Sequence, residues 1–159
     1  MSTFYDYKYQ LNIKVLNNDL LDHYINFKNY HEGDSGIDLL NPYDILNIKS
    51  FNVGKIDFQI QCEMINLEDN KYCSYSIEPR SSIINEKLIM GNSRGIIDAG
   101  YRGNIIAKFI NMNEDNYDLK KNKSFFQILS PTLQPIKINI VNELSNTTRN
   151  DGGFGSTNK

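Results

Sequence analysis

The sequence predicts one all-β domain, of the kind found in sandwiches, jelly rolls and barrels. Apolar and polar residues alternate over residues 56–64 and 135–140, which is the period of a strand with one buried face. Turn sequences such as Asn41-Pro42 and Glu68-Asp69-Asn70 interrupt the chain at short intervals. The length of 159 residues suits a single domain, and many short strands at this spacing are typical of antiparallel β folds.

Further strands are expected, in chain order, at six short stretches. They cover residues 11–16, 37–40, 72–77, 83–90, 105–110 and 125–129. Only residues 19–28 have a helical pattern, because the apolar side chains between Leu20 and Ile25 recur on one face. Residues 145–159 contain almost no apolar side chain except Phe154. We therefore expect a β domain over residues 1–144 and a flexible C-terminal arm over residues 145–159.

Composition and charge exclude several classes of partner and location. The formal net charge of −2 argues against nucleic acid as a partner. No apolar run is long enough to cross a membrane, so no membrane partner is expected either. The first ten residues lack the pattern of a signal peptide, which favours a soluble intracellular protein, in the cytoplasm or the nucleus.

Several kinds of catalytic chemistry lack the residues that they need. The two histidines, His23 and His31, have no cysteine or aspartate at the spacing of a zinc site. Cys62 and Cys73 lie on strand-like stretches and are expected to be buried thiols rather than nucleophiles. A Ser-His-Asp hydrolase is hard to build from so few histidines, and the chain has no P-loop sequence.

Three polar segments that contain glycine remain as candidates for a site. Asp38 lies within the first, residues 33–39, where an apolar strand is expected. The second, Pro79-Arg80-Ser81-Ser82, combines a guanidinium with hydroxyls and suits an anion. The third, residues 92–103, joins the strands of an expected hairpin, and Asp98 at the end of an apolar run suits a general base. Taken singly, each segment also fits an ordinary surface turn.

In this order, the segments resemble the sequence motifs of the trimeric dUTP pyrophosphatases (dUTPases). Residues 36–39 (Gly-Ile-Asp-Leu) resemble the first motif and residues 79–82 the second, while residues 95–103 (Gly-Ile-Ile-Asp-Ala-Gly-Tyr-Arg-Gly) nearly match the third. Gln127-Ile128 resembles the end of the fourth, although Ser124 stands where a basic residue is usual. Arg149 followed by residues 152–157 (Gly-Gly-Phe-Gly-Ser-Thr) resembles the fifth. Through these five motifs the chain is identified as a member of the family.

The resemblance implies a jelly-roll subunit of the dUTPase-like β-clip type, which forms a homotrimer with shared active sites. It implies hydrolysis of dUTP to dUMP and pyrophosphate, which limits uracil incorporation into DNA and supplies dUMP. Asp98 would activate the water that attacks the α-phosphorus. The cofactor would be Mg²⁺, held chiefly by the phosphates and, through water, by Asp38. Attack by a positioned water needs no covalent nucleophile, which agrees with the exclusions above.

The resemblance also implies which residues contact the nucleotide. Asn92, Gly95 and Ile106 would read the edge of uracil, and Tyr101 would pack under the deoxyribose. The phosphates would be held by Arg80, Ser81, Ser82 and Gln127. The arm would close over the site with Arg149, Phe154, Gly155, Ser156 and Thr157, of which Phe154 would stack on uracil.

Two alternatives belong to neighbouring classes of protein. dCTP deaminases share the fold and a similar Arg-Ser-Ser sequence, but they use a glutamate where this chain has Lys108 and tend to carry tryptophan in place of Tyr101. The second alternative is a dUTPase-like nucleotide-binding protein that acts in regulation without turnover. The joint presence of Asp98, Tyr101, Arg149 and Phe154 argues against it.

Arginine is scarce and concentrated in the motifs. The chain has four arginines, at positions 80, 94, 102 and 149, against 13 lysines. Bidentate phosphate binding and buried ion pairs favour arginine over lysine. We expect Arg80 and Arg149 to bind phosphates and Arg102 to be structural or intersubunit, while the sequence assigns no role to Arg94.

Overall fold

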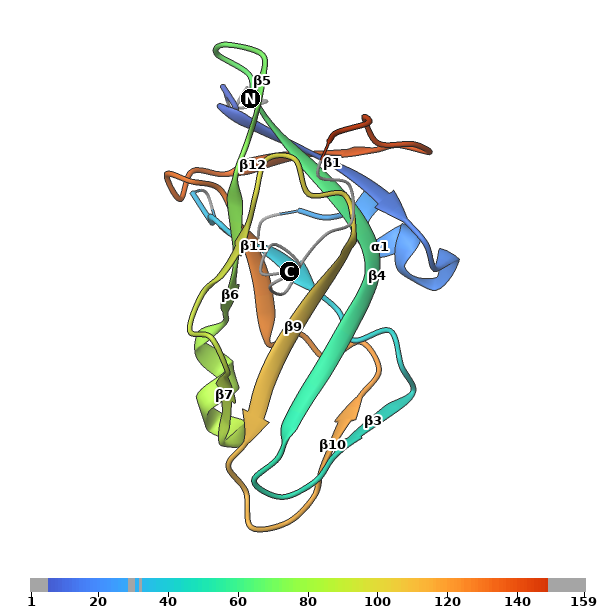
Figure 1. Ribbon diagram of the computed structural model, residues 1–159, viewed down its shortest axis with the longest axis vertical. Helices are drawn as coiled ribbons and strands as arrows, with labels where there is room; N and C mark the ends of the chain where they lie inside the picture. Colours follow the sequence, from blue (N-terminus) through green and yellow to red (C-terminus); the bar gives the residue numbers. More distant parts are fainter. Residues whose placement is uncertain (1–5, 29–30, 32, 149–159) are drawn as a thin grey trace.

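Strand β4 (Val53–Asn66) is the centre of the fold in the computed structural model, which describes residues 6–28, 31 and 33–148 (Figure 1). The alternation predicted for this strand is confirmed, because its apolar side chains Ile56, Phe58, Ile60, Cys62 and Met64 are all buried. Burying a large apolar side chain of this kind contributes about 1.5–3 kcal/mol. One face of β4 therefore packs on the core.

The described part of the chain forms three sheets. The largest has the strand order β12 (Ile136–Ile140), β1 (Tyr9–Val15), β4, β9 (Asn104–Asn111) and β7 (Leu88–Met90), and β5 (Lys71–Cys73) also pairs with β4. The second has the order β2 (Ile37–Leu39), β11 (Phe126–Leu129), β6 (Tyr75–Pro79) and β8 (Gly95–Ile97). The third is the pair β10 (Tyr117–Lys120) and β3 (Ile45–Ile48). Neighbouring strands are antiparallel except β1 and β12.

Aromatic contacts join the two larger sheets across the core. The ring of Phe126 on β11 lies 6.0 Å from the ring of Phe58 on β4 and 5.9 Å from that of Phe109 on β9, measured between centroids. These are ordinary separations for edge-to-face and tilted aromatic pairs. The four-stranded sheet is thereby fixed against the large sheet, and the ends of its strands carry most of the residues that the sequence singled out.

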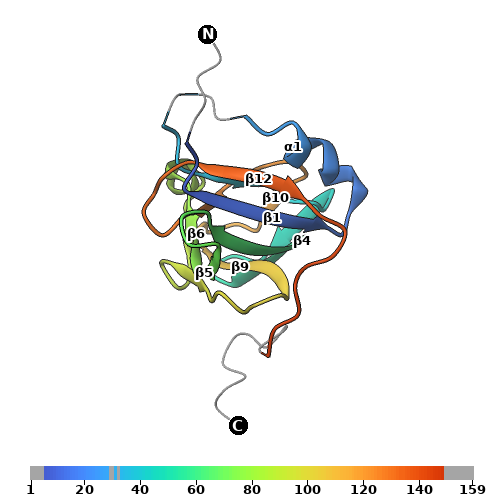
Figure 2. The same cartoon turned by 90° about the horizontal axis from the view of Figure 1, so that it is seen from above.

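The one α-helix of the described residues is short. Helix α1 (Leu21–Ile25) follows the 3₁₀ turn η1 (Asn18–Leu20) and lies beside β12 at the edge of the large sheet (Figure 2). The side chain of Asn17 accepts a hydrogen bond from the Asp19 N–H and so caps the turn. The helix predicted over residues 19–28 is confirmed in type but ends earlier. Within the described residues, no helix combines the length and the apolar character needed to cross a membrane.

The strand predicted over residues 83–90 is wrong in its first half. The 3₁₀ helix η2 (Ser81–Glu86) occupies that stretch, and Lys87, with a φ of 52°, ends it before β7 begins. A short apolar run such as Ile83-Ile84 fits a helical turn as well as a strand, and here Ile83 is buried while Ile84 is exposed.

Other strands differ from the prediction in their limits. The stretch predicted over residues 72–77 breaks at Ser74 into β5 and β6. Strands β3 and β10 were not predicted, because each is only four residues long. Strand β8 is the short apolar strand expected before Asp98. Cys62 is buried as expected, whereas Cys73 on the short strand β5 is only partly buried.

Candidate functional site

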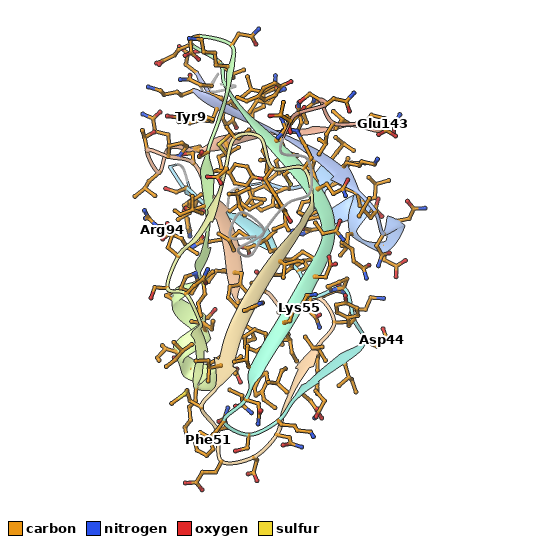
Figure 3. The ribbon with its side chains drawn as sticks, viewed as in Figure 1. Tyr9, Asp44, Phe51, Lys55, Arg94 and Glu143 are labelled. Atoms are coloured by element: carbon orange, nitrogen blue, oxygen red, sulfur yellow. The ribbon has the colours of Figure 1, made fainter. Side chains whose placement is uncertain are left out.

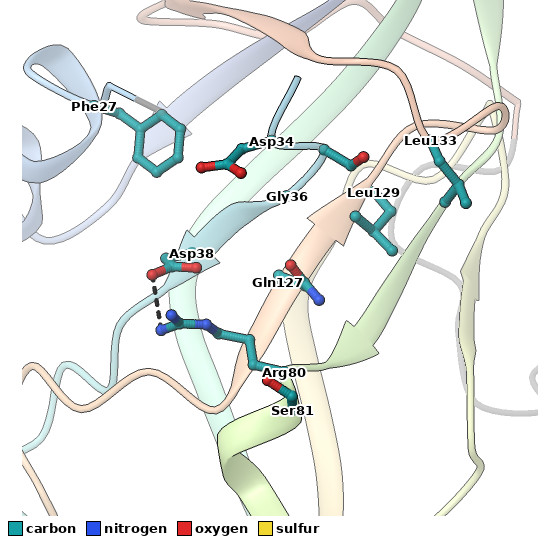
Figure 4. A pocket seen from close by; sticks show the side chains of 10 residues that line it. Phe27, Asp34, Gly36, Asp38, Arg80, Ser81, Gln127, Leu129 and Leu133 are labelled. Carbon is teal, nitrogen blue, oxygen red and sulfur yellow. Dashed lines mark ion pairs between the residues drawn. The ribbon is translucent and has the colours of Figure 1, made fainter. Parts of the chain in front are cut away.

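A cavity of about 420 Å³ lies where β2 and β11 meet the end of β6 (Figure 4). Its polar lining consists of Asp34, Ser35, Asp38, Arg80, Ser81 and Gln127. Asp38 on β2 and Gln127 on β11 are directly opposite each other in the antiparallel ladder, so their side chains lie on the same face of the sheet. The Arg80 N–H donates a 2.8 Å hydrogen bond to the carbonyl of Phe125, which holds the segment after β6 against the segment before β11.

Asp38 and Arg80 form an ion pair at this cavity. Arg80 Nη1 lies 2.8 Å from Asp38 Oδ2 and also donates to the carbonyl of Ser124 at 3.2 Å. Burial raises the pKa of Asp38, and the positive charge of Arg80 and the neighbouring His23 oppose this rise. The arrangement offers one guanidinium, one carboxylate and nearby hydroxyl and amide groups, which together suit a phosphate and its counter-cation.

A second cavity, of about 560 Å³, shares the Asp38–Arg80 pair with the first. Its other polar lining residues are His23, Ser82, Asn85, Glu86, Asn122, Lys123 and Ser124. Ser81 and Ser82 are neighbours in the chain but line different cavities. Of the predicted site residues, the structure thus brings Asp38, Arg80, Ser81, Ser82 and Gln127 together.

The backbone at Gly36 lies close to the side chain of Gln127. A Cβ atom on Gly36 would collide with Oε1 and Cδ of the Gln127 side chain. Gln127 Nε2 donates to the carbonyl of Pro79 at 3.4 Å, which directs the amide toward the end of β6. A larger residue at position 36 would therefore displace the Gln127 amide from the cavity.

Asp98 and Tyr101 lie in a turn at the other end of the four-stranded sheet. Asp98 directly follows β8, and the Tyr101 N–H donates to the Asp98 carbonyl at 3.0 Å. The Tyr101 hydroxyl donates to the carbonyl of Asn104 at 2.9 Å. A Cβ on Gly103 would collide with the Tyr101 hydroxyl and ring, so the tyrosine requires a glycine there. The prediction that Asp98 ends a strand is confirmed.

The remaining candidates of the third motif are spread over neighbouring strands. Asn92 is exposed in the loop between β7 and β8, Gly95 on β8 lies opposite Ile77 of β6, and Ile106 on β9 lies opposite Asp57 of β4. Strands β7 and β9 pair with each other, as the predicted hairpin requires. Residues 95–97 within its connection pair instead with β6 of the other sheet.

Strand β6 separates the residues at the cavity of Arg80 from those of the Asp98 turn. The Ala99 N–H donates to the Ser74 hydroxyl at 3.2 Å, so the turn of Asp98 lies at the start of β6. Arg80 follows the end of the same strand. The six steps along the chain from Ser74 to Arg80 span about 20 Å at about 3.3 Å per residue. Within one chain, Asp98 and the cavity of Arg80 are therefore far apart.

The other arginines and the start of the predicted arm also have defined places. Arg94 lies at the surface (Figure 3). Its Nη2 atom is 2.7 Å from Glu78 Oε1, a contact that no signal in the sequence indicated. Arg102 is buried and pairs with Glu63. Ser145 and Thr147 form hydrogen bonds with the domain. Arg149, Phe154, Gly155, Ser156 and Thr157 lie outside the described residues, and the boundary at residue 144 stays a prediction.

Sequence reasoning missed several residues that line the cavities. Phe27, Leu129 and Leu133 form the apolar wall of the first cavity, and His23 and Lys123 line the second. Phe27 and Leu133 lie outside the motifs, and no local pattern marks them. The described residues contain no group of three or more His, Cys, Asp or Glu side chains that could hold a metal ion.

Comparisons with known proteins give a consistent result. The family model of dUTPase matches residues 22–158. The deoxyuridine 5'-triphosphate nucleotidohydrolase of Clostridium tetani is 34% identical over 154 residues, which cover 96% of this chain and 99% of that protein. The protein of the same name from Clostridioides difficile is 31% identical over 150 residues, covering 94% and 98%.

Solved structures show the same fold. The dUTPase of Streptococcus mutans has a TM-score of 0.59 at 21% identity, over 74% of this chain and 92% of that one. A mutant dUTPase of Staphylococcus bacteriophage 80alpha with dUpNHpp has a TM-score of 0.59 at 18% identity, over 93% and 98%. The fold is therefore the all-β jelly roll of these proteins, and the chain belongs to the dUTPase family.

Proposed function

We propose that this protein hydrolyses dUTP to dUMP and pyrophosphate, and thereby limits uracil incorporation into DNA and supplies dUMP. The observation that carries the proposal is the joint presence of Asp38, Arg80, Ser81 and Gln127 around one cavity in a chain of this family. The resemblance assigns these four residues to the phosphates and their metal. Arg80 and the hydroxyl and amide groups would bind the phosphates of the substrate.

Asp98 would act as the general base. In the reaction, a water oxygen bonds to the α-phosphorus, the bond from the α-phosphorus to the bridging oxygen breaks, and pyrophosphate leaves. Asp98 would take the proton from the water as the new bond forms. Its place directly after β8 supports this role, because the side chain lies at the tip of a strand and is partly exposed.

Uracil and deoxyribose would bind along the third motif. Asn92, Gly95 and Ile106 would contact uracil, and Tyr101 would pack under the sugar. The Tyr101 ring is fixed by its hydrogen bond to the Asn104 carbonyl and by its contact with Gly103. A rigid ring under the sugar leaves no room for a 2′-hydroxyl, which would discriminate against UTP by about 10- to 200-fold.

The separation along β6 supports a homotrimer with shared active sites. A single nucleotide cannot place its α-phosphorus at Asp98 and its outer phosphates at Arg80 of the same chain across about 20 Å. Two copies in a closed ring can bring the cavity of one chain to the Asp98 turn of another. The arm, residues 145–159, would supply Arg149, Phe154, Gly155, Ser156 and Thr157 and exclude water when substrate binds.

The residues of the cavity fit Mg²⁺ bound together with the phosphates. Mg²⁺ is usually held by one or two carboxylates plus substrate phosphates, and Asp38 with Asp34 nearby provides that donor set rather than a closed protein cage. Asp38 would hold the ion through water. When bound, Mg²⁺ would neutralise part of the charge of the triphosphate.

The test is hydrolysis of four nucleotides by the purified protein. With Mg²⁺, pyrophosphate release from dUTP should exceed that from dTTP, dCTP and UTP by at least tenfold. Comparable turnover of all four would contradict the proposal. Release of ammonia from dCTP would instead identify a deaminase, and tight dUTP binding without pyrophosphate release would identify a binding protein.

A further inference from the structure

A buried ion pair lies at the Asp98 turn, outside the two cavities described above. Arg102 Nε is 3.1 Å from Glu63 Oε2, and the side chains are only 8% and 5% exposed. Asn12 Nδ2 donates to Glu63 Oε1 at 2.9 Å, which fixes the carboxylate between β1 and β4. Removing two charges from water is costly unless their hydrogen bonds are satisfied. The pair makes hydrogen bonds with the Asp98 turn and with Ser145.

Arg102 binds the turn that carries Asp98 and Tyr101. Its Nη1 atom donates to the carbonyl of Ala99 at 2.8 Å and to the carbonyl of Tyr101 at 2.9 Å. These two peptide groups lie on either side of Gly100, which contributes no side chain to hold the turn. The guanidinium therefore fixes the backbone between Asp98 and Tyr101 from the inside.

The same pair binds the chain at Ser145. Arg102 Nε donates to the Ser145 carbonyl at 3.1 Å and Nη2 to the Ser145 hydroxyl at 2.9 Å. Glu63 Oε2 accepts from the Ser145 N–H at 3.0 Å and from the Ser145 hydroxyl at 2.6 Å. Two residues later, the Thr147 hydroxyl donates to the Gly100 carbonyl. The start of the predicted arm and the Asp98 turn are thus held by one set of contacts.

We propose that Arg102 and Glu63 are positioning residues that hold the Asp98–Tyr101 turn and the chain at Ser145 in one fixed arrangement. The inference rests on the proposed dUTP hydrolysis, because the pair would hold the turn that carries the general base of that reaction. Arg102 acts through the backbone of Ala99 and Tyr101. The segment that leads into the fifth motif then starts from a fixed point beside the turn that carries the general base.

Only arginine can make this set of contacts. The guanidinium presents five N–H donors in a planar fork, and here it reaches two turn carbonyls, two oxygens of Ser145 and one of Glu63. A lysine keeps the charge opposite Glu63 but offers a single nitrogen. Arg102→Lys therefore keeps a buried charge opposite Glu63 but removes most of the contacts that fix the turn.

The experiment compares kcat, KM and melting temperature for three variants of the pair and one control variant. Arg102→Lys should lower kcat by about 10- to 100-fold with a smaller change in KM, because a displaced general base costs rate more than binding. Arg102→Gln leaves Glu63 as an uncompensated buried charge, so the double variant E63Q/R102Q, in which both charges are removed, keeps the test valid if the single variant does not fold. Arg94→Gln, which removes an exposed arginine in the same motif, is the matched control and should keep the wild-type kcat.

Amide hydrogen exchange provides a readout that does not depend on turnover. The Ser145 N–H donates to Glu63, so its exchange should be at least tenfold faster in Arg102→Lys and in E63Q/R102Q. The Arg80 N–H, which donates to Phe125 near the cavity, should keep its rate. Such a pattern localises the effect to the turn and to Ser145.

The outcomes separate this inference from the proposed function. Wild-type kcat in both Arg102→Lys and E63Q/R102Q, even with a lower melting temperature, would assign the pair a purely structural role and overturn the inference alone. Unchanged exchange at Ser145 would overturn it as well. A wild-type protein that does not hydrolyse dUTP would refute the proposed function itself.

Discussion

Arg80 Nη1 lies 2.8 Å from Asp38 Oδ2, so the cation expected to bind phosphate and the carboxylate expected near Mg²⁺ neutralise each other in this structure. The pair lines both cavities, and the side chains of Arg80 and Asp38 are 35% and 21% exposed. A phosphate at Arg80 and a cation at Asp38 would replace this one ion pair by two new ones. The pair therefore compensates the two opposite charges within one chain.

The stability of the protein should reveal the cost of keeping Asp38 ionised. Burial raises the pKa of Asp38 above its ordinary value of 3.8, and Arg80 and His23 oppose the rise only in part. A raised pKa in the folded state contributes stability at low pH, and this contribution is lost as the pH rises through the folded pKa. Asp38→Asn should therefore raise the melting temperature at pH 7–8 by about 1–3 °C while it lowers dUTP hydrolysis.

Calorimetry as a function of pH checks this sign. The difference between Asp38→Asn and the wild type should shrink as the pH falls below the unfolded pKa of 3.8, because the wild-type carboxyl then becomes protonated in both states. Asp44→Asn, at a side chain that is 92% exposed, is the control and should leave the melting temperature unchanged. A lower melting temperature for Asp38→Asn at pH 7–8 would contradict the prediction.

Glu63 should show the opposite pH dependence. Burial alone would raise its pKa, but hydrogen bonds from Ser145 and Asn12 and the charge of Arg102 outweigh burial and lower it below 4.5. Its contribution to stability is present above the unfolded pKa and is lost as the pH falls through the folded pKa. Glu63→Gln should lower the free energy of unfolding at pH 7 by about 3 kcal/mol. Urea unfolding at pH 7 and pH 3 should show the difference shrinking at the lower pH, and an equal loss at both would refute the assignment.

Replacement of the proposed general base should separate binding from chemistry. Asp98→Asn keeps the size of the side chain but cannot take a proton, so kcat should fall by about 10²- to 10⁴-fold while the affinity for a non-hydrolysable dUTP analogue changes little. Single-turnover kinetics and calorimetric titration measure the two quantities. Full activity in this variant would show that another group activates the water.

Mixing two inactive variants tests whether each site takes residues from different chains. If Arg80 and Asp98 of one site belong to two copies, Arg80→Gln and Asp98→Asn subunits refolded together in equal amounts should regain about one quarter of the wild-type activity, since each site needs two intact contributions at a probability of about one half each. Light scattering should give the mass of three chains. Sites contained within one chain would remain inactive in the mixture.

Removal of the predicted arm should affect activity far more than stability. A chain that ends after Thr148 keeps the contacts of Ser145 and Thr147 with the domain but loses the fifth motif. We expect kcat/KM for dUTP to fall by at least 100-fold because the site no longer excludes water and loses contacts with the phosphates. The melting temperature should change by less than about 2 °C. Unchanged kcat/KM would mean that residues 149–159 do not take part in the reaction.

The sequence was most informative where its signal was local. The alternation around Phe58 predicted the central strand, and the motif around Asp98 predicted a strand end followed by a turn, because side-chain period and glycine positions depend only on nearby residues. Residues 83–86 were assigned wrongly for the same reason, since two adjacent isoleucines fit a 3₁₀ turn and a strand equally well. No local signal distinguished Glu63 from the other polar residues that alternate along its strand.

The sequence by itself therefore determined the all-β class, the main strands and the residue types of each motif. Only the tertiary structure decided which of these residues meet. Pairing register places Asp38 opposite Gln127, and the length of β6 keeps Asp98 away from Arg80. The tertiary structure also brings Glu63 into contact with Ser145, 82 residues further along the chain. Such contacts arise because separate segments must bury one shared core and satisfy their polar groups across it, a condition that no short stretch of sequence records.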